Sequence, residues 1–524
     1  MIDTVALREK VLDLAIRGKL VPQDPNDEPA SVLLERIREQ KQQMVKEGKL
    51  KAKDIKDDSV IFVGDDNLHY EKFADGTVKC IEDEIPFELP EGWAWCRLRE
   101  IFNVCSAKRV LQSEWKTEGV PFYRAREIVK LANNGYVDNE LFISPEHYEK
   151  LKETYGVPQT GDLMVTGVGT IGKVHIVREK DVFYYKDASV LCFENRYGVI
   201  NSEYARIMID SSLLQEQIHS KTYGNTVDTI TISTAINYLC ILPPISEQSK
   251  IVQSVKNAVC LIDKIESDNK EIRNTISLIK SKVLDLAIRG KLVPQNPDDE
   301  PASVLLERIR AEKEELIKQG KIKRDKKESI IFKGDDNSYY EKVGDSVENI
   351  TDEIPFEVAQ GVELVRLKSL WGLLSGRDLA PSEYNDCGKG IPYITGASNF
   401  VNGEIQINRW TEKAQVVSCI GDLLITCKGT IGEIAINDFG EAHLARQIMA
   451  IRNILDLNLD YLAICIKYHI EFIKASAKGL IPGISREDIL NLILPIPTKT
   501  QQTTTVQKVN ELFTIIDTIE KSLN

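Results

Sequence analysis

The chain carries one long stretch twice. Residues 10–38 have the sequence KVLDLAIRGKLVPQDPNDEPASVLLERIR, and residues 282–310 repeat 27 of these 29 positions at an offset of 272 residues. Self-similarity on this scale indicates a repeated architecture. Since half of a 524-residue chain is the size of a domain, we expect two related halves rather than one continuous core.

A long helix is predicted between the two halves, over residues 247–289. Apolar residues recur there at alternating steps of four and three residues, which is the spacing of a coiled-coil seam. Asn269 fills the one polar position, where a single Asn commonly fixes the register of the partner helix. The seam consists of Ile251, Val255, Ala258, Ile262, Ile265, Ile272, Ile276, Ile279, Val283 and Leu286.

The two ends of the chain repeat the two parts of this helix. Residues 505–519 match the apolar positions of 251–265 at an offset of 254, and residues 4–14 match those of 276–286 at an offset of 272. The terminal helices together rebuild one central helix, so the chain has a circular pseudo-two-fold repeat. We expect both terminal helices to pack antiparallel along the central helix.

A second amphipathic helix is predicted over residues 30–47, ended by Gly48. Two alternatives stay open for its apolar face: packing on the chain's own helices, or binding to an external subunit. Acidic lead-in segments follow both copies of the repeat, with 4 Lys/Arg against 12 Asp/Glu in residues 52–95 and 5 against 11 in residues 324–365. Their shared GDDN sequence is interpreted as a solvated turn rather than a metal site.

The two larger segments, 93–243 and 362–497, have the alternating strands, Gly turns and short helices of mixed α/β domains. Each contains a similar turn, GDLMVTGVGTIGKVHIV at 161–177 and GDLLITCKGTIGEIAI at 421–436. The first nearly matches a phosphate-binding loop, but Val174 replaces the required hydroxyl and Glu433 replaces the lysine in the second. We therefore predict a tight turn between two strands and not a nucleotide site.

Composition excludes several other classes. The net charge of −13 lies mainly in the lead-ins and leaves both α/β segments close to neutral, so a local basic face remains compatible with either. Ten cysteines form no CxxC pair and six histidines do not cluster with them, so we expect no metal and reduced thiols in a cytoplasmic protein. No apolar run suits a membrane span. No catalytic motif was found, and we predict that the chain itself is not an enzyme.

The two α/β segments differ most just after a shared framework. GVPF at 119–122 matches GIPY at 390–393, but YRAREI then stands against ITGASN. Arginine forks suit guanine edges or phosphates, and Asn399 suits adenine, so two readers of different DNA sequences are predicted. Loop drift after duplication is the alternative. The candidate DNA contacts are Lys108, Arg109, Arg124, Arg126, Glu127, Thr170, Lys173, Arg377, Thr395, Ser398, Asn399, Lys428 and Thr430.

With these features together, the chain resembles the specificity subunit of type I restriction–modification systems. The resemblance rests on the repeated KVLDLAIRGKLVPQ, on IPFELPEGWAWCRL at 85–98, on the Gly turn and on LPPISEQ at 242–248. It implies an α+β fold with two mixed α/β target-recognition domains separated by long antiparallel coiled-coil helices. It also implies a bipartite double-stranded DNA site, two methyltransferase (modification) subunits that bring AdoMet, and further restriction and translocase subunits.

The resulting hypothesis is a non-enzymatic DNA-recognition subunit without a cofactor of its own. The rival hypothesis is a coiled-coil scaffold whose α/β domains bind proteins. The expected segments are 1–51 and 498–524 (terminal helical parts), 52–92 and 324–361 (lead-ins), 93–243 and 362–497 (recognition domains), and 244–323 (central helices).

Overall fold

The computed structural model describes residues 2–48, 50–52, 55–220, 229–322, 324, 328–354, 356–401, 403–455, 457–476 and 483–523. The chain divides into two compact units, Ile2–Asn269 and Lys270–Asn524. We call them the amino-terminal unit and the carboxy-terminal unit. Each unit contains one copy of the repeat and one α/β domain, so the prediction of two related halves is confirmed.

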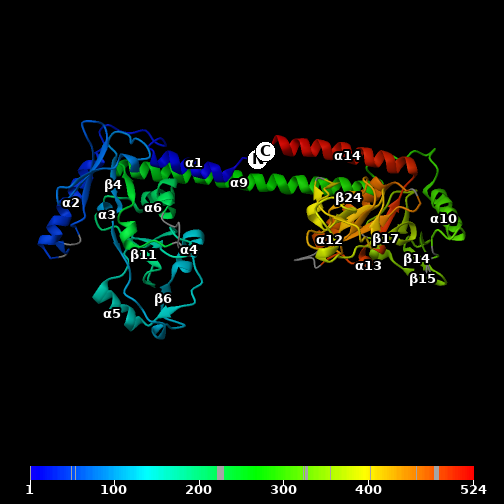
Figure 1. Cartoon of the computed structure of the whole chain (residues 1–524), viewed down its shortest axis with the longest axis horizontal. Coiled ribbons are helices and arrows are strands. Elements are labelled where there is room, and N and C mark those ends of the chain that lie inside the picture. Colours follow the sequence, from blue (N-terminus) through cyan, green and yellow to red (C-terminus); the bar gives the residue numbers. More distant parts are fainter. Residues whose placement is uncertain are drawn as a thin grey trace. The chain divides into compact units, whose positions relative to one another are not determined.

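In the amino-terminal unit, helix α1 (Thr4–Ile16) lies along the first part of the 44-residue helix α9 (Ile245–Ile288) (Figure 1). The Arg8 guanidinium forms ion pairs with the carboxylates of Asp263 and Glu266. Near the start of α1, the Asn269 side-chain amide donates to the carbonyl of Ile2 at 3.1 Å. Because residue numbers fall along α1 as they rise along α9, the two helices are antiparallel.

In the carboxy-terminal unit, helix α14 (Lys499–Ser522) lies along the second part of α9 in the same way. The Lys280 ammonium lies 2.7 Å from the carboxylate of Asp517 and 3.2 Å from that of Glu520. Lys280 is Arg8 shifted by 272 residues, and the two acids are Asp263 and Glu266 shifted by 254. The circular repeat therefore extends to individual ion pairs, and the predicted antiparallel packing is confirmed within each unit.

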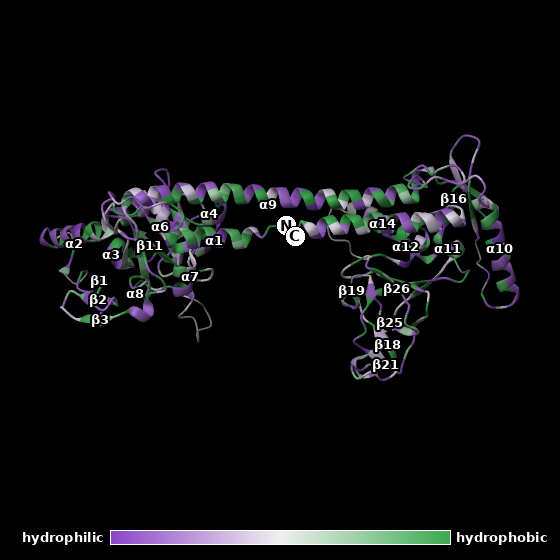
Figure 2. Cartoon of the chain, turned by 90° about the horizontal axis from the view of Figure 1, so that it is seen from above, coloured by the Kyte–Doolittle hydropathy of each residue, from purple (hydrophilic) through white to green (hydrophobic). Residues whose placement is uncertain are grey.

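The predicted seam is correct at most positions of α9 but wrong at Ile279. Ile251, Val255, Ile262, Ile276 and Val283 are buried, whereas Ile279 is 45% exposed. Figure 2 shows apolar and polar residues alternating along α9 and both terminal helices.

The helix predicted at 30–47 is present as α2 (Ala30–Lys46), and its copy is α10 (Ala302–Lys318). The apolar face of α2 is buried in the core of its own unit through Leu33, Leu34 and Ile37. These three residues therefore pack on the chain's own core, whereas Val32 on the same helix is 40% exposed.

Each acidic lead-in folds into a three-stranded antiparallel sheet, which the sequence analysis did not predict. The orders are β1-β2-β3 and β13-β14-β15. The shared GDDN is the predicted turn: Asp66 accepts hydrogen bonds from the Leu68 backbone N–H at 3.2 Å and the Tyr70 hydroxyl at 2.7 Å. The strands are β1 (Ser59–Val63), β2 (His69–Phe73), β3 (Val78–Cys80), β13 (Ser329–Lys333), β14 (Tyr339–Val343) and β15 (Ser346–Asn349).

A buried ion-pair cluster joins the lead-in sheet of the amino-terminal unit to its α/β domain. The Arg97 guanidinium lies 2.7 Å from the Glu71 carboxylate and 2.8 Å from that of Glu84. Arg97 and Glu71 are almost fully buried, so their charges satisfy each other away from water. In the carboxy-terminal unit the same cluster is made by Arg366, Glu341 and Glu353.

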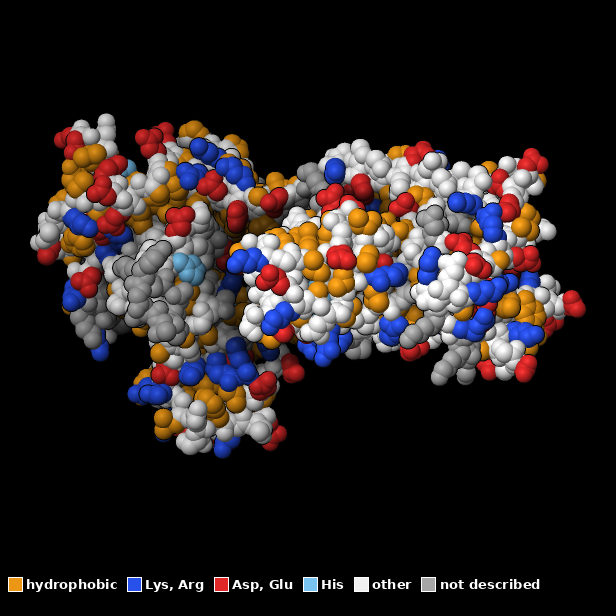
Figure 3. Space-filling view, turned by 45° about the vertical axis from the view of Figure 1, so that its right-hand side comes forward, with side chains coloured by type: hydrophobic (Ala, Val, Ile, Leu, Met, Phe, Trp, Pro, Cys, Tyr) orange, Lys and Arg blue, Asp and Glu red, His pale blue; other side chains and the backbone are white. Residues whose placement is uncertain are grey.

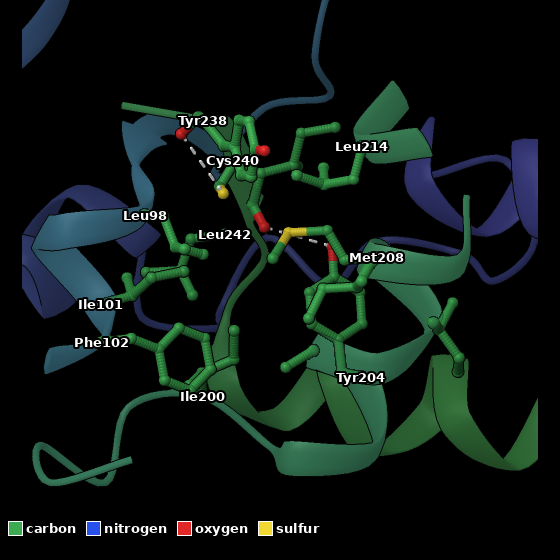
Figure 4. Close-up of a cluster of buried hydrophobic side chains, with 14 of the residues drawn as sticks. Leu98, Ile101, Phe102, Ile200, Tyr204, Met208, Leu214, Tyr238, Cys240 and Leu242 are labelled. Atoms are coloured by element: carbon green, nitrogen blue, oxygen red, sulfur yellow. Dashed lines mark hydrogen bonds between the residues drawn. The ribbon is translucent and has the colours of Figure 1, made fainter. Parts of the chain in front are cut away.

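The α/β domain of the amino-terminal unit contains a four-stranded sheet of order β5-β11-β8-β9, a sheet of order β10-β6-β7 and the pair β12-β4. Part of its core is shown in Figure 4, where the Tyr204 hydroxyl donates to the Ile241 carbonyl at 3.3 Å. The strands are β4 (Ala94–Arg97), β5 (Asn103–Cys105), β6 (Val120–Tyr123), β7 (Phe142–Ile143), β8 (Leu163–Thr166), β9 (Val174–Ile176), β10 (Tyr184–Tyr185), β11 (Val190–Glu194) and β12 (Leu239–Leu242). The helices are α3 (Leu98–Ile101), α4 (Ala125–Asn134), α5 (Pro145–Tyr155), α6 (Ser202–Asp210), α7 (Ser212–His219) and α8 (Ile232–Ala235).

The α/β domain of the carboxy-terminal unit repeats the order of the four-stranded sheet and of the two-stranded pair, and it has further strands, β19, β20 and β22. Its sheets have the orders β17-β26-β23-β24, β21-β18-β25-β22, β16-β27 and β19-β20. The strands are β16 (Glu363–Arg366), β17 (Gly372–Ser375), β18 (Ile391–Ile394), β19 (Phe400–Val401), β20 (Glu404–Ile405), β21 (Trp410–Thr411), β22 (Val417–Ser418), β23 (Leu423–Thr426), β24 (Ile434–Ile436), β25 (Ala442–Leu444), β26 (Ile448–Arg452) and β27 (Ile493–Ile496). The helices are α11 (Leu367–Leu370), α12 (Leu459–Ser476) and α13 (Arg486–Leu490).

Candidate nucleic-acid interface

Three loops that carry predicted DNA contacts meet in the amino-terminal unit around residues 186–189, which connect β10 to β11. The Lys186 backbone N–H donates to the Tyr123 carbonyl at 2.8 Å, at the end of β6. The Ala188 N–H donates to the Ser106 hydroxyl at 3.2 Å, in the loop after β5. The Ser189 carbonyl accepts from the Gly167 N–H at 2.9 Å, in the turn between β8 and β9. We call residues 186–189 the amino-terminal linker.

The carboxy-terminal unit builds the same junction around residues 445–447, which connect β25 to β26. The Ala445 N–H donates to the Ile394 carbonyl at 2.9 Å, and the Gln447 carbonyl accepts from the Cys427 N–H at 2.8 Å. The Arg446 N–H donates to the Asp378 carboxylate at 3.1 Å. We call residues 445–447 the carboxy-terminal linker. Two equivalent three-loop surfaces therefore stand on the same backbone frame.

The loop after β5 or β17 is fixed by an aromatic residue of the adjacent parallel strand. The Tyr184 hydroxyl accepts from the Lys108 N–H at 3.0 Å. At the equivalent position, His443 hydrogen-bonds through Nε2 to the Arg377 carbonyl at 2.9 Å. Burial lowers the pKa of His443, which favours the neutral ring, whose Nδ1 can accept from the Val416 N–H at 3.2 Å. The side chains of Lys108, Arg109 and Arg377 are exposed, as an interface with phosphates requires.

Arg124 and Arg126 follow β6, and both are held by Glu127 at the start of α4. The Glu127 carboxylate accepts from the Arg124 backbone N–H at 2.9 Å and from its guanidinium at 2.8 and 3.1 Å. It also accepts from Arg126 Nε at 2.5 Å, and the same guanidinium pairs with Glu140. Burial raises the pKa of Glu127, but the arginine hydrogen bonds outweigh it and keep this pKa below its usual value. Glu127 is buried, so the prediction that it contacts DNA itself is corrected.

At the equivalent place after β18, the structure corrects the prediction for Asn399. Its side chain is fully buried, so it cannot present an amide to adenine. The carbonyl oxygen of that amide accepts from the Thr395 N–H at 2.9 Å and from the Thr395 hydroxyl at 3.1 Å. The amide nitrogen donates to the Gln406 carbonyl at 2.8 Å. Ser398 is exposed and Thr395 is half-buried, so these two remain on the accessible side of the loop.

The two Gly turns connect antiparallel strands, β8 to β9 and β23 to β24, as predicted. The Thr166 hydroxyl closes the first turn by donating to the Thr170 carbonyl at 2.6 Å. A phosphate-binding loop connects a strand to a helix, so this geometry excludes one here. Thr170, Lys173, Lys428 and Thr430 are all exposed on the turns.

Sequence reasoning missed the side chains of the two linkers. Lys186 is half-buried in the amino-terminal linker, and Arg446 and Gln447 are exposed in the carboxy-terminal linker. Arg446 is 67% exposed, and its guanidinium lies 2.8 Å from the Asp378 carboxylate. Aligning the strands on either side, β10 with β25 and β11 with β26, would have revealed another short segment with different polar residues.

In the view of Figure 3, Lys and Arg side chains gather on the lobe at the lower left, the region of β6 and α5 in Figure 1. This local basic character suits an anionic partner despite the negative net charge. Over the described residues, no group of three or more His, Cys, Asp or Glu side chains is placed to hold a metal ion. None of the helices in the described ranges is both long and apolar enough to cross a membrane.

The fold and these surfaces define a chain with two recognition domains on one repeated helical frame. The family model for the type I restriction modification DNA specificity domain matches residues 90–275 and 360–524. The chain therefore belongs to this family of type I restriction–modification specificity subunits.

Individual relatives agree with this family. The EcoEI type I restriction enzyme specificity subunit of Escherichia coli is 25% identical, over 99% of this chain and 90% of its own length. The EcoAI specificity subunit of the same species is 27% identical over 71% of this chain and 63% of its own. A solved structure on complex assembly and conformational transition of the type I R-M system has a chain of similar fold, with a TM-score of 0.55, 16% identity and coverage of 83% of this chain and 94% of that one.

Proposed function

We propose that each unit recognises one half of a bipartite DNA site through the three loops that meet at its linker. Single loops with Lys or Arg are common on protein surfaces and carry little weight alone. The observation that carries the proposal is the repeated junction: in both units the backbone of the linker makes hydrogen bonds to three loops, while the side chains on the loops differ. A fixed frame with different polar residues suits two different base sequences.

The exposed residues divide by the kind of contact they suit. Lys108, Arg109, Arg377, Lys173 and Lys428 are exposed cations suited to phosphates, which position the protein but specify no base. Arg124, Arg126, Thr395 and Ser398 come directly after the shared framework strands and are the better candidates for base edges. We assign no direct base contact to Glu127 or Asn399.

We further propose that the chain is not catalytic and acts with two methyltransferase subunits, which supply AdoMet and methylate adenine. The doubled frame supports this stoichiometry, since each unit repeats the helix pair and its ion pairs. Restriction and translocase subunits complete a cleaving complex. A scaffold that binds only proteins is disfavoured by the family match.

The test is to co-express the chain with its methyltransferase subunits and to sequence genomic DNA for methylated adenines. A bipartite motif with two defined halves and an unspecified spacer is expected. The double variant R124A/R126A should relax base preference in one half only, because both arginines belong to one unit. A single continuous motif, or relaxation in both halves, would contradict separate readout. Absence of methylation and of salt-dependent DNA binding by the complex would favour the scaffold.

A further inference from the structure

We propose that Glu127 is a positioning residue that sets the base specificity of the first half-site, and that Asn399 does the same for the second. This inference rests on the proposed function and goes beyond it. It assigns specificity to two buried side chains that touch no DNA and act through the exposed residues next to them.

The buried carboxylate of Glu127 holds two neighbouring arginines. Its two carboxylate oxygens accept four hydrogen bonds, three from Arg124 and one from Arg126, at 2.5–3.1 Å. The Glu127 side chain is 2% exposed, while those of Arg124 and Arg126 are 24% and 49% exposed. One buried anion therefore holds two guanidinium groups, of which that of Arg126 also pairs with the exposed Glu140, and their remaining N–H donors can reach solvent. A guanidinium reads guanine through two parallel hydrogen bonds, which requires a fixed plane.

Glu127 and Asn399 bind the backbone at the same place in the two units, directly after the shared strand. The Arg124 N–H follows β6 and is bound by the side chain three residues later; the Thr395 N–H follows β18 and is bound by the side chain four residues later. In both units a buried side chain thus takes the first backbone donor after the shared strand and also holds the neighbouring polar side chain. The binder is anionic where that neighbour is arginine and neutral where it is threonine.

The charge of Glu127 matches the charge of the loop that it holds. A carboxylate with no cation beside it is costly to bury, so Glu127 suits only a loop that supplies cations. A neutral amide in its place would leave two arginines without their shared anion and free to adopt other rotamers. The expected consequence is loss of selectivity rather than loss of the fold, because an amide retains an oxygen that can accept the Arg124 N–H.

The experiment uses the full chain in complex with its methyltransferase subunits. Methylation rates are measured on the cognate duplex and on duplexes with one base pair changed in either half-site. The variants are Glu127→Gln and Asn399→Ser, which introduces no buried charge, and the control is Glu153→Gln, which removes one exposed negative charge on α5. Melting temperatures are measured for all complexes.

In Glu127→Gln we expect the ratio of cognate to substituted rates to fall by about tenfold at one or more positions of the first half-site. Discrimination in the second half-site should stay at the wild-type value, and Asn399→Ser should show the reverse pattern. Glu153→Gln should keep both ratios. A merely structural residue would slow all duplexes together and leave the ratios unchanged.

Unchanged ratios in Glu127→Gln would overturn the proposal, and so would a uniform loss of methylation with a lowered melting temperature in either variant. Relaxation of both half-sites by one variant would also overturn it. These failures are distinct from failure of the proposed function, in which the wild-type complex itself would show no two-part preference.

Discussion

The helix pairs and the recognition loops of the two units differ in how closely they repeat each other. In the helix pairs, Arg8 with Asp263 and Glu266 is repeated by Lys280 with Asp517 and Glu520, so chemistry and position are both retained. In the loops, the backbone junction is retained, but the side chains that occupy it are replaced. Side chains that hold the frame are thus constrained in both units, while those on the recognition surface are free to specify different sequences.

The largest expected change in stability follows from removing the arginine of the buried ion-pair cluster in either unit. Arg97→Ala removes the guanidinium that binds both carboxylate oxygens of buried Glu71 and leaves only that of Arg99, 2.8 Å away, so the free energy of unfolding should fall by about 3 kcal/mol. Arg366→Ala should cost less, because the side chains of Glu341 and Glu353 are more exposed than those of Glu71 and Glu84. Urea denaturation of the full chain measures both. A larger loss for Arg366→Ala would contradict this ranking.

The next largest effects are expected from substitutions of the side chains in the two linkers, and they concern DNA recognition. Arg446→Ala and Gln447→Ala should each weaken base preference in the second half-site by about 1–3 kcal/mol if they make bidentate base contacts. Lys186→Ala should instead lower DNA affinity similarly for all sequences and reduce its salt dependence, as loss of a phosphate contact does. Methylation motifs and binding at several salt concentrations separate these outcomes. If the Arg446 or Gln447 variants changed the base preference in the first half-site, the carboxy-terminal linker would not belong to the reader of the second half-site.

A pH-dependent effect on stability is expected from Glu100 of the amino-terminal unit. Burial and the neighbouring Asp58 raise the pKa of Glu100 to about 7 from 4.5, although Lys41 opposes this shift. The folded chain therefore binds a proton that the unfolded chain has lost, and stability from this group falls as pH rises from 4.5 to 7. Its counterpart in the repeat is Ser369, which does not titrate in this range.

The variant Glu100→Gln tests this difference. Its stability relative to the wild type should rise steadily between pH 4.5 and 7 and change little above that range. Denaturation midpoints across this pH range provide the measurement, with Ser369→Ala as the control whose difference from wild type should not vary with pH. A pH-independent difference for Glu100→Gln would mean that Glu100 is not protonated in the folded chain.

The smallest effect is expected for the repeated ion pairs of the helices. Arg8→Ala and Lys280→Ala remove partly exposed cations, and each should lower the free energy of unfolding by only about 0.2–1 kcal/mol. High salt should reduce the difference further. Losses of several kcal/mol would show that these pairs, rather than the apolar seam, hold the helices together.

The frame could be predicted from the sequence because its signals are periodic or repeated. The seam of α9, the two offsets and the Gly turns each depend on spacing within the chain, and the structure departs from them mainly at Ile279. The lead-in strands were missed because acidic residues obscured a period-two pattern. The buried residue of β2 is Glu71, and its negative charge is balanced by Arg97, which lies 26 residues away in the sequence.

The recognition surface could be predicted only in part. Divergence after GVPF and GIPY pointed to loops whose contact with DNA stays a prediction, and the side chains of Arg124 and Arg126 on the first of them are 24% and 49% exposed. It could not distinguish a residue that faces solvent from one that closes the loop, so Glu127 and Asn399 were both taken for contacts. Lys186 and Arg446 were missed because a parallel strand pair, β6-β10 or β18-β25, brings distant segments together without any local signal.

The most direct test of the account is a chain in which residues 362–497 are replaced by a second copy of residues 93–243, with the helices unchanged. The frame is repeated and each domain is proposed to read its half-site alone. The complex with the methyltransferase subunits should therefore methylate a motif in which both halves carry the first half-sequence, while the second half-sequence is lost. Sequencing of methylated adenines gives the answer. A folded, active complex that retains the original second half-sequence, or that recognises a half-sequence found in neither unit, would contradict independent readout on a shared frame.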